Sequence, residues 1–154
     1  MDSFLGEFWS GLPNSTEVGR ISFRLLAAMI LGGAIGYQRE QAGKPAGLRT
    51  HMLVAMGTAL FVMGAEEHGM GSDELSRIIQ GLATGIGFIG GGAILKMAAE
   101  HEIKGLTSAA GIWMTAAIGV AVGLGHWGVA AMAVIFTLIT LAVLVRFEIP
   151  VSDD

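Results

Sequence analysis

The sequence predicts an all-α polytopic membrane protein, a bundle of about five transmembrane helices with glycine-rich packing. Hydrophobic residues make up 53% of its 154 residues and charged residues only 14%, and the mean hydropathy is +0.64. Apolar stretches of about 20 residues, the length that crosses a bilayer, recur along the chain. The 24 glycines accompany only 3 prolines, so they indicate closely packed transmembrane helices rather than a linker.

The chain is expected to form one transmembrane domain, over residues 20–148. Its predicted spans are 20–38, 48–65, 77–96, 106–125 and 128–147. Residues 1–19 carry apolar residues at helical spacing (Phe4, Leu5, Phe8, Trp9 and Leu12). This pattern favours a short helix lying on the membrane surface, with a disordered terminus as the alternative. Residues 149–154 form a tail.

Basic residues in the short loops predict the orientation. They gather at one side of the predicted bundle (Arg39, Lys44, Arg49, Lys96, Lys104 and Arg146), while the loop after the second span is acidic. Basic loops face the cytoplasm, so the N-terminus is expected outside and the C-terminus inside. Arg20 and Arg24 oppose this orientation but are outnumbered.

Composition and motifs exclude several classes of protein. The chain has no cysteine, which removes disulfides, thiol catalysis and thiolate metal sites. Its net charge of −4, with no basic stripe between aromatics, argues against nucleic-acid binding. The sequence contains no glycine-rich nucleotide motif, no Ser-His-Asp set and no zincin motif, so an enzyme is not expected.

Small residues at i, i+4 spacing predict where helix backbones approach closely. The glycines concerned are Gly32 and Gly36 in the first span, Gly81, Gly85, Gly87 and Gly91 in the third, and Gly111, Gly119 and Gly123, with Thr115, in the fourth. The fifth span has no such ridge and is expected to face lipid. We expect a homo-oligomer, with a dimer favoured, to form through one of these glycine faces.

A weak internal repeat is visible at an offset of 58 residues. Gly32 matches Gly90, and Gly47-Leu48 matches Gly105-Leu106. A real repeat would make each half a pair of helices, whereas chance is the alternative in a chain so rich in glycine and alanine.

The stretch REQAGKPAGLRTH, residues 39–51, crowds charge between two apolar spans. Glu40 ends the first helix and Arg49 begins the second, so each charge is unfavourable for the dipole of its own helix. A Glu40–Arg49 ion pair would reconcile both charges and clamp the hairpin, with an ordinary solvated basic loop as the alternative. Arg39, Lys44 and Arg49 are also candidates to contact an anion. That anion would be a lipid headgroup, or alternatively a phosphate or nucleotide.

Arg24 is a charge inside a predicted span, which is costly in a bilayer. It shares a face with Gly32 and Gly36, so a partner inside the bundle is expected, although snorkelling to the interface is the alternative. We expect Arg24 to meet Gln80 and Thr84 in a buried polar network. The full set of candidate polar residues is Arg24, Glu40, Arg49, Thr50, Arg77, Gln80, Thr84, Thr107 and Ser108.

The predicted spans contain no Asp or Glu, and permeation of a divalent cation requires carboxylates or carbonyl rings in the membrane. The acidic outer loop has no ligand spacing, so loose Mg²⁺ binding there is a weak alternative to a solvated loop. No cofactor is required, and Mg²⁺ or an anionic lipid are the species that the protein could bind.

Three separated blocks of the sequence resemble the transmembrane domain of the MgtC/SapB family. They are GGAIGYQREQAGKPAGLRTHMLVAMGTALF, RIIQGLATGIGFIGGGAILK and GLTSAAGIWMTAAIGVAVGLG, and the resemblance covers about residues 20–147. It implies a bacterial inner-membrane protein that acts in adaptation to low Mg²⁺ and other stress, in a virulence-associated family. Some members carry a cytoplasmic domain after the last span, and functions that depend on that domain are not expected from these residues.

Two functions follow from this resemblance and stay open. The first is a regulatory or interaction protein that engages other membrane proteins, such as the F-type ATP synthase. The second is a transporter or channel for Mg²⁺ or another ion. The absence of acids from the predicted spans favours the first.

Overall fold

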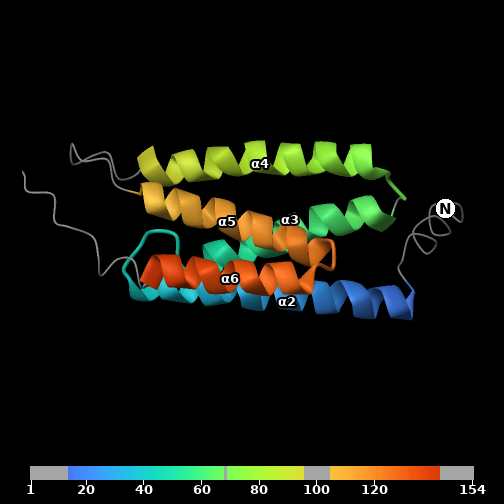
Figure 1. Ribbon diagram of the computed structural model, residues 1–154, viewed down its shortest axis with the longest axis horizontal. Helices are drawn as coiled ribbons and strands as arrows, with labels where there is room; N and C mark the ends of the chain where they lie inside the picture. Colours follow the sequence, from blue (N-terminus) through green and yellow to red (C-terminus); the bar gives the residue numbers. More distant parts are fainter. Residues whose placement is uncertain (1–13, 68, 96–104, 143–154) are drawn as a thin grey trace, which may run out of the picture.

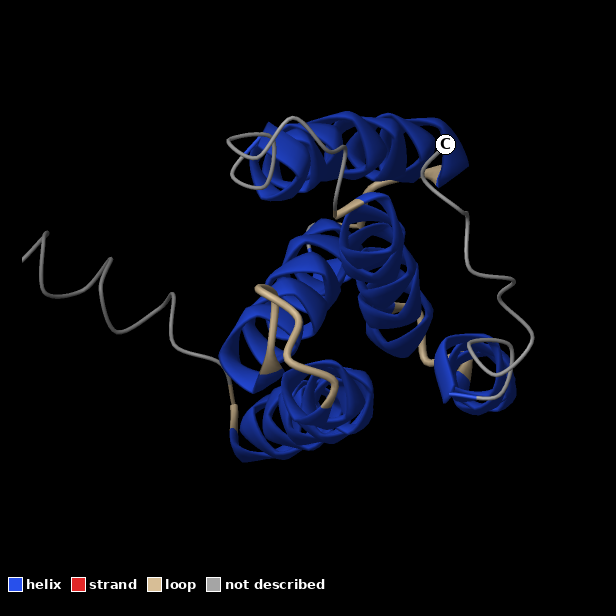
Figure 2. Cartoon of the chain, turned by 90° about the vertical axis from the view of Figure 1, so that its left-hand side faces the viewer, coloured by secondary structure: helices blue, strands red, loops and turns tan. Residues whose placement is uncertain are grey.

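The computed structural model describes residues 14–67, 69–95 and 105–142, and the described part consists of helices joined by short loops (Figures 1 and 2). The helices are α2 (Ser15–Gln41), α3 (Leu48–Glu67), α4 (Ser72–Leu95), α5 (Leu106–Gly123) and α6 (Trp127–Ala142). No strand occurs in these residues, so the predicted all-α class is confirmed. The orientation in a membrane stays a prediction.

The four helices α2 to α5 are long and apolar enough to cross a membrane. The fifth predicted span corresponds to α6, which has 16 described residues, and residues 143–147 of that span lie outside the described part. Helix α2 begins at Ser15, earlier than predicted, because Asn14 and Glu17 form a capping box around its first turn. The predicted surface helix lies mostly in residues 1–13, which are outside the described part.

Helix α5 lies at the centre of the bundle and contacts each of the other four helices. Helices α2, α3 and α5 pack against one another and form a three-helix core. Helix α4 is peripheral: it packs along α5, makes fewer contacts with α3, and among the described residues touches neither α2 nor α6. Figure 1 shows α4 along one side of the bundle, with α2 on the opposite side.

The glycine ridges of α2 and α5 bring both helices against α3. A Cβ added to Gly32 would lie 2.6 Å from the carbonyl oxygen of His51, and one added to Gly36 would lie 2.7 Å from the Cα of Leu48. A Cβ on Gly119 would collide with the Thr58 hydroxyl and the Ala55 carbonyl oxygen. Only glycine permits these backbone distances.

The glycine ridges of α4 have a different environment: the described residues do not pack against them, and the expected contact between copies through a glycine face stays a prediction. No atom of the described residues lies within 4 Å of a Cβ added to Gly81, Gly85, Gly87 or Gly91. Helix α4 runs through this glycine-rich segment without a break. Its close approach to α5 is made at Gly90, where an added Cβ would lie 3.4 Å from that of Ala109.

The contacts of Gly32 and Gly90 agree with the internal repeat. Gly32 packs against His51 and Gly90 packs against Ala109, and the offset of 58 residues equates both members of the two pairs. The helix pair α2–α3 therefore approaches at the position equivalent to that of the pair α4–α5.

Candidate functional site

The bundle has two polar ends. The end where α2 ends and where α3 and α5 begin is called the basic end here, because Arg39, Lys44 and Arg49 lie there. The end where α3 ends and α4 begins is called the acidic end, after Glu66 and Glu67.

Glu40 joins α2 to α3 at the basic end, but not through the predicted partner. Its Oε2 accepts a hydrogen bond of 2.8 Å from the backbone N–H of Leu48, the first residue of α3. The positive end of the α3 dipole favours a carboxylate at this place, and the bond satisfies a backbone donor that has no partner within the helix.

The predicted Glu40–Arg49 ion pair is absent. Among the described residues, the ion pairs within 4.0 Å are Arg20–Glu67 and Arg24–Glu66, while Glu40 and Arg49 are both exposed. Glu40 therefore still links the two helices, but it is held by the backbone of α3 rather than by a side chain.

Arg39 is the buried charge of the basic end. Arg39 is only 2% exposed, and its Nη2 donates to Ser108 Oγ of α5 at 3.2 Å. No carboxylate lies within 4.0 Å of it among the described residues. Arg39 was predicted to contact an anion or lipid together with Lys44 and Arg49, but its side chain is buried in the three-helix core and donates to Ser108 instead of lying beside those two exposed cations.

His51, which the sequence analysis did not single out, lies beside Arg39 and is fully buried. Its Nδ1 donates to the carbonyl oxygen of Gly47 at 3.0 Å. The other ring nitrogen, Nε2, faces α5 at Gly111 and has no hydrogen-bond partner among the described residues. In the neutral ring with this tautomer, Nε2 is an acceptor.

Gln38, the residue before Arg39, is half-buried and contacts α6 instead. Gln38 donates through Nε2 to the Leu141 carbonyl of α6 at 3.3 Å. Gln38 Oε1, Arg39 Nε and His51 Nε2 are buried without a partner in the described part. Buried polar atoms without partners are costly, so Arg39 and its neighbour His51 mark a candidate functional site.

Arg24 occupies the acidic end and has other partners than predicted. Its Nη1 lies 2.6 Å from Glu66 Oε2 of α3 and also donates to the Gly123 carbonyl at the end of α5. The side chain is only 14% exposed, so it faces the bundle, as expected. A cation at the carboxyl ends of two helices is favourable, and Arg24 thereby ties the three core helices together.

Gln80 and Thr84 do not meet Arg24, and the predicted network is wrong in these members. Gln80 donates to Ser76 and the Thr84 hydroxyl donates to the Gln80 carbonyl, so both bond within α4. Both are exposed, as are Arg77 of α4 and Thr107 of α5. Of the predicted polar residues, only Ser108 is hydrogen-bonded to a buried charged side chain, that of Arg39, in the described part of the chain.

Lys44 and Arg49 line a polar pocket of about 290 Å³ at the basic end. We call it the basic pocket, and its other lining residues are Glu40, Pro45, Gly47, Leu48 and Thr50. Both cations are exposed, so they remain candidates to contact an anion, whereas Arg39 does not.

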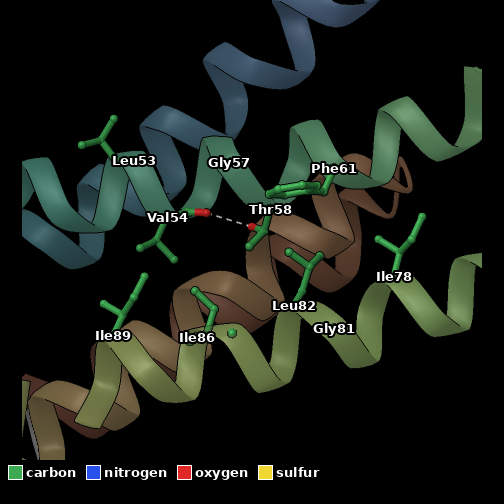
Figure 3. Close-up of a pocket in the computed structure, with 11 residues that line it drawn as sticks. Leu53, Val54, Gly57, Thr58, Phe61, Ile78, Gly81, Leu82, Ile86 and Ile89 are labelled. Carbon is green, nitrogen blue, oxygen red and sulfur yellow. Dashed lines mark hydrogen bonds between the residues drawn. The ribbon is translucent and has the colours of Figure 1, made fainter. Parts of the chain in front are cut away.

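An apolar groove of about 620 Å³ separates α3 from α4. Figure 3 shows Ile89, Ile86 and Leu82 reaching from α4 toward α3, from which Val54 and Thr58 point back. Gly81 and Gly85 of α4 and Gly57 of α3 also line the groove. The Thr58 hydroxyl donates to the Val54 carbonyl, so the groove presents little polarity to an occupant.

The described residues do not bring together three or more His, Cys, Asp or Glu side chains that could hold a metal ion. The acids of the described part lie at the ends of helices, and the charge buried beside Ser108 is a cation. This arrangement suits anions and polar neutral groups better than Mg²⁺.

The chain matches the model of the MgtC family over residues 25–149. It is 45% identical to Protein SrpB of Synechococcus elongatus, over 89% of this chain and 81% of that protein. It is 44% identical to the Putative magnesium transporter YhiD of Escherichia coli, over 78% of this chain and 58% of that protein. It is 41% identical to Protein MgtC of Salmonella typhimurium, over 74% and 48%. The chain thus spans about half the length of the last two relatives, and no solved structure matches it.

Proposed function

Because the chain belongs to the MgtC family of membrane proteins, we propose that it is a multi-pass protein of the bacterial inner membrane with a regulatory or interaction role. It acts in adaptation to low Mg²⁺ or a related stress and does not itself carry Mg²⁺. The observation that carries this proposal is the burial of Arg39, with Ser108 as its partner and without a carboxylate within 4.0 Å in the described part.

A buried cation opposes passage of a divalent cation through the same bundle. Two like charges repel strongly where the dielectric constant is low, and a Mg²⁺ path requires oxygen ligands to replace the water of the ion. Arg39 lies where α2, α3 and α5 meet, so a path through the three-helix core would pass close to its charge.

The outer face of α4 is a surface on which partners would bind. Gln80, Thr84, Gly87 and Gly91 follow one another at i, i+4, i+7 and i+11, and the first three are exposed. Polar and small residues on a membrane helix favour contact with another helix rather than with lipid. The candidate partners are a second copy of this chain, as a dimer, and other membrane proteins such as the ATP synthase.

A transporter of Mg²⁺ is the second candidate function. It is favoured by one relative, whose printed name is that of a putative magnesium transporter, and an oligomer would provide carbonyls or acids that one chain lacks. The two candidates differ in a measurable property, which is saturable ion flux through the purified protein.

The test uses the full chain reconstituted in liposomes that contain a Mg²⁺ indicator. We expect Mg²⁺ entry no faster than in liposomes without protein. In cells that lack the gene, growth at limiting Mg²⁺ should be restored by the wild-type chain and lost with Arg39→Met at equal membrane abundance. Saturable Mg²⁺ flux through the wild-type chain would overturn the regulatory proposal in favour of transport.

Binding of partners is tested at the outer face of α4. The chain has no cysteine, so Gly91→Cys introduces a single thiol there, and Gly19→Cys near the start of α2 is a matched control, since neither site has an atom of the described residues within 4 Å of the added Cβ. We expect oxidation in membranes to link two copies through Gly91→Cys but not through Gly19→Cys. Equal linking at both sites would contradict a specific dimer.

A further inference from the structure

We propose that the basic pocket and the α3–α4 groove together form one binding site for an anionic phospholipid. The headgroup lies at Lys44 and Arg49, and one acyl chain lies in the groove. This inference does not depend on the proposed function, since a regulator and a transporter could both carry such a site.

The basic pocket has the charge for a phosphate-bearing headgroup. Lys44 and Arg49 are exposed, and among the described residues neither is within 4.0 Å of a carboxylate. Glu40 also lines the pocket, but its carboxylate is engaged by the Leu48 N–H. Two cations against one engaged carboxylate leave a net positive charge, which attracts an anionic headgroup.

Thr50 connects the pocket to the groove. It lines the basic pocket, while Leu53 and Val54, three and four residues later on α3, line the groove. Residues at these spacings lie on one face of a helix. The same face continues through Gly57 and Phe61, which also line the groove, so a polar site and an apolar site follow each other along α3.

The length of the groove matches one leaflet of a membrane. Its lining residues on α4 run from Ile78 to Ile89, which is about 16 Å along the helix axis at about 1.5 Å per residue. One leaflet contributes about half of a hydrocarbon core that is about 30 Å thick. A chain that enters beside Thr50 would therefore run along the groove toward Ile78 over a length comparable to that of one leaflet.

The shape of the groove favours an acyl chain over a protein helix. Helices α3 and α4 contact each other along part of their length, and a helix with its side chains is about 10–12 Å wide, too wide to enter between them. Gly57, Gly81 and Gly85 keep the groove open because they place no side chain in it. A narrow, flexible chain of methylene groups fits this space.

The groove is tested with glycine variants of the full chain. Gly85→Leu fills it from α4 and Gly57→Leu fills it from α3, and neither added Cβ has an atom of the described residues within 4 Å. Gly128→Leu on α6 is the control, since it is equally open but lies outside the groove. Each protein is purified from vesicles of equal parts phosphatidylglycerol and phosphatidylcholine, and the retained lipids are counted by native mass spectrometry.

We expect the wild-type chain and Gly128→Leu to retain about one phospholipid per chain, mainly phosphatidylglycerol. Each groove variant should lose this lipid, with occupancy reduced at least fivefold. Lys44→Gln and Arg49→Gln should keep a lipid but lower the preference for phosphatidylglycerol by about fivefold each.

Two outcomes would overturn the proposal. One is unchanged lipid occupancy in both groove variants at wild-type stability. The other is an altered oligomeric state of the groove variants without a change in lipid, which would make the groove a contact between copies instead.

Discussion

Two sets of glycines with the same i, i+4 spacing have opposite surroundings in this bundle. In the three-helix core, glycines of α2 and α5 touch the backbone of α3, and an added Cβ would collide with it. On α4, Gly81, Gly85, Gly87 and Gly91 have no atom of the described residues within 4 Å of an added Cβ. The spacing predicts that another helix can approach closely, but it does not identify that helix or show whether it belongs to the same chain.

This difference divides the bundle into two parts. The three-helix core is packed by contacts within the chain, whereas these glycines of α4 are open to contact with lipid or a partner. The core helices are also tied at both ends, by Arg24 to α3 and α5 and by Glu40 to the start of α3. Helix α4 has hydrogen bonds from Gln80 and Thr84 only within itself. Stability is therefore expected to be concentrated in the core, and association with lipid or partners on α4.

The largest effect is expected for Gly119→Ala in the core. The added methyl group would meet the Thr58 hydroxyl and the Ala55 carbonyl, and the backbone atom cannot move without shifting α3. Overpacking of this kind costs about 1–3 kcal/mol or more. Thermal unfolding in detergent should show a clear loss of stability, with Gly87→Ala as the matched control. An unchanged unfolding temperature for Gly119→Ala would contradict the close α3–α5 packing.

A second large effect is expected for Arg24→Met, which removes the tie at the acidic end. The change leaves Glu66 without its ion pair and the Gly123 carbonyl without its donor. Hydrogen bonds to charged groups contribute about 1.5–3 kcal/mol each when buried, and partial exposure of this pair reduces that figure. We expect a destabilisation of about 1–2 kcal/mol, measured by chemical unfolding.

The matched control is Arg77→Met on α4, which is exposed and should change the unfolding free energy by less than about 0.5 kcal/mol. Equal effects of the two arginine changes would show that the core is not the stable part of the bundle.

The sequence predicts the core better than it predicts the sites. Hydropathy locates α2 to α5, and the ridges of Gly32, Gly36 and Gly119 identify the helix faces that pack. The burial of Arg39 could also have been predicted. Arg39 lies three residues after Gly36 and therefore lies on the same packed face of α2. Ser108 likewise lies three residues before Gly111, on the packed face of α5. The contact between Arg39 and Ser108 is therefore expected when the glycine ridge of each helix is extended by one turn.

Other contacts could not be predicted because periodicity gives the faces of a helix but not its neighbours. Gln80 and Thr84 share a face of α4, yet nothing local states that this face points away from α2. The pairing of Arg24 with Glu66 depends on how α2 and α3 are rotated, although both residues lie at the same end of the hairpin. His51 gave no signal, because a lone histidine in an apolar helix has no recognisable spacing.

A moderate effect is expected for Glu40→Ala at the basic end. The change removes the acceptor of the Leu48 N–H, and loss of a cap at a helix start costs about 0.5–2 kcal/mol. Arg49→Ala is the control, because it forms no ion pair within 4.0 Å among the described residues. Hydrogen exchange at the first turn of α3 should rise for Glu40→Ala and stay unchanged for Arg49→Ala. An equal rise for both variants would instead support an ion pair between the two residues.

The smallest effect on stability is expected for Gly87→Ala on α4, and it tests the comparison most directly. The new methyl group meets no atom of the described residues within 4 Å, and alanine is favoured over glycine inside a helix by about 0.5–1 kcal/mol. The isolated chain in detergent should therefore be as stable as the wild type or slightly more so. If Gly87 lies in a contact between copies, the same change should weaken dimer cross-linking through Gly91→Cys in membranes, because the two backbones can no longer approach as closely. A loss of stability in the isolated chain would instead mean that the face is already packed within one molecule, and the distinction between the core and α4 would fail.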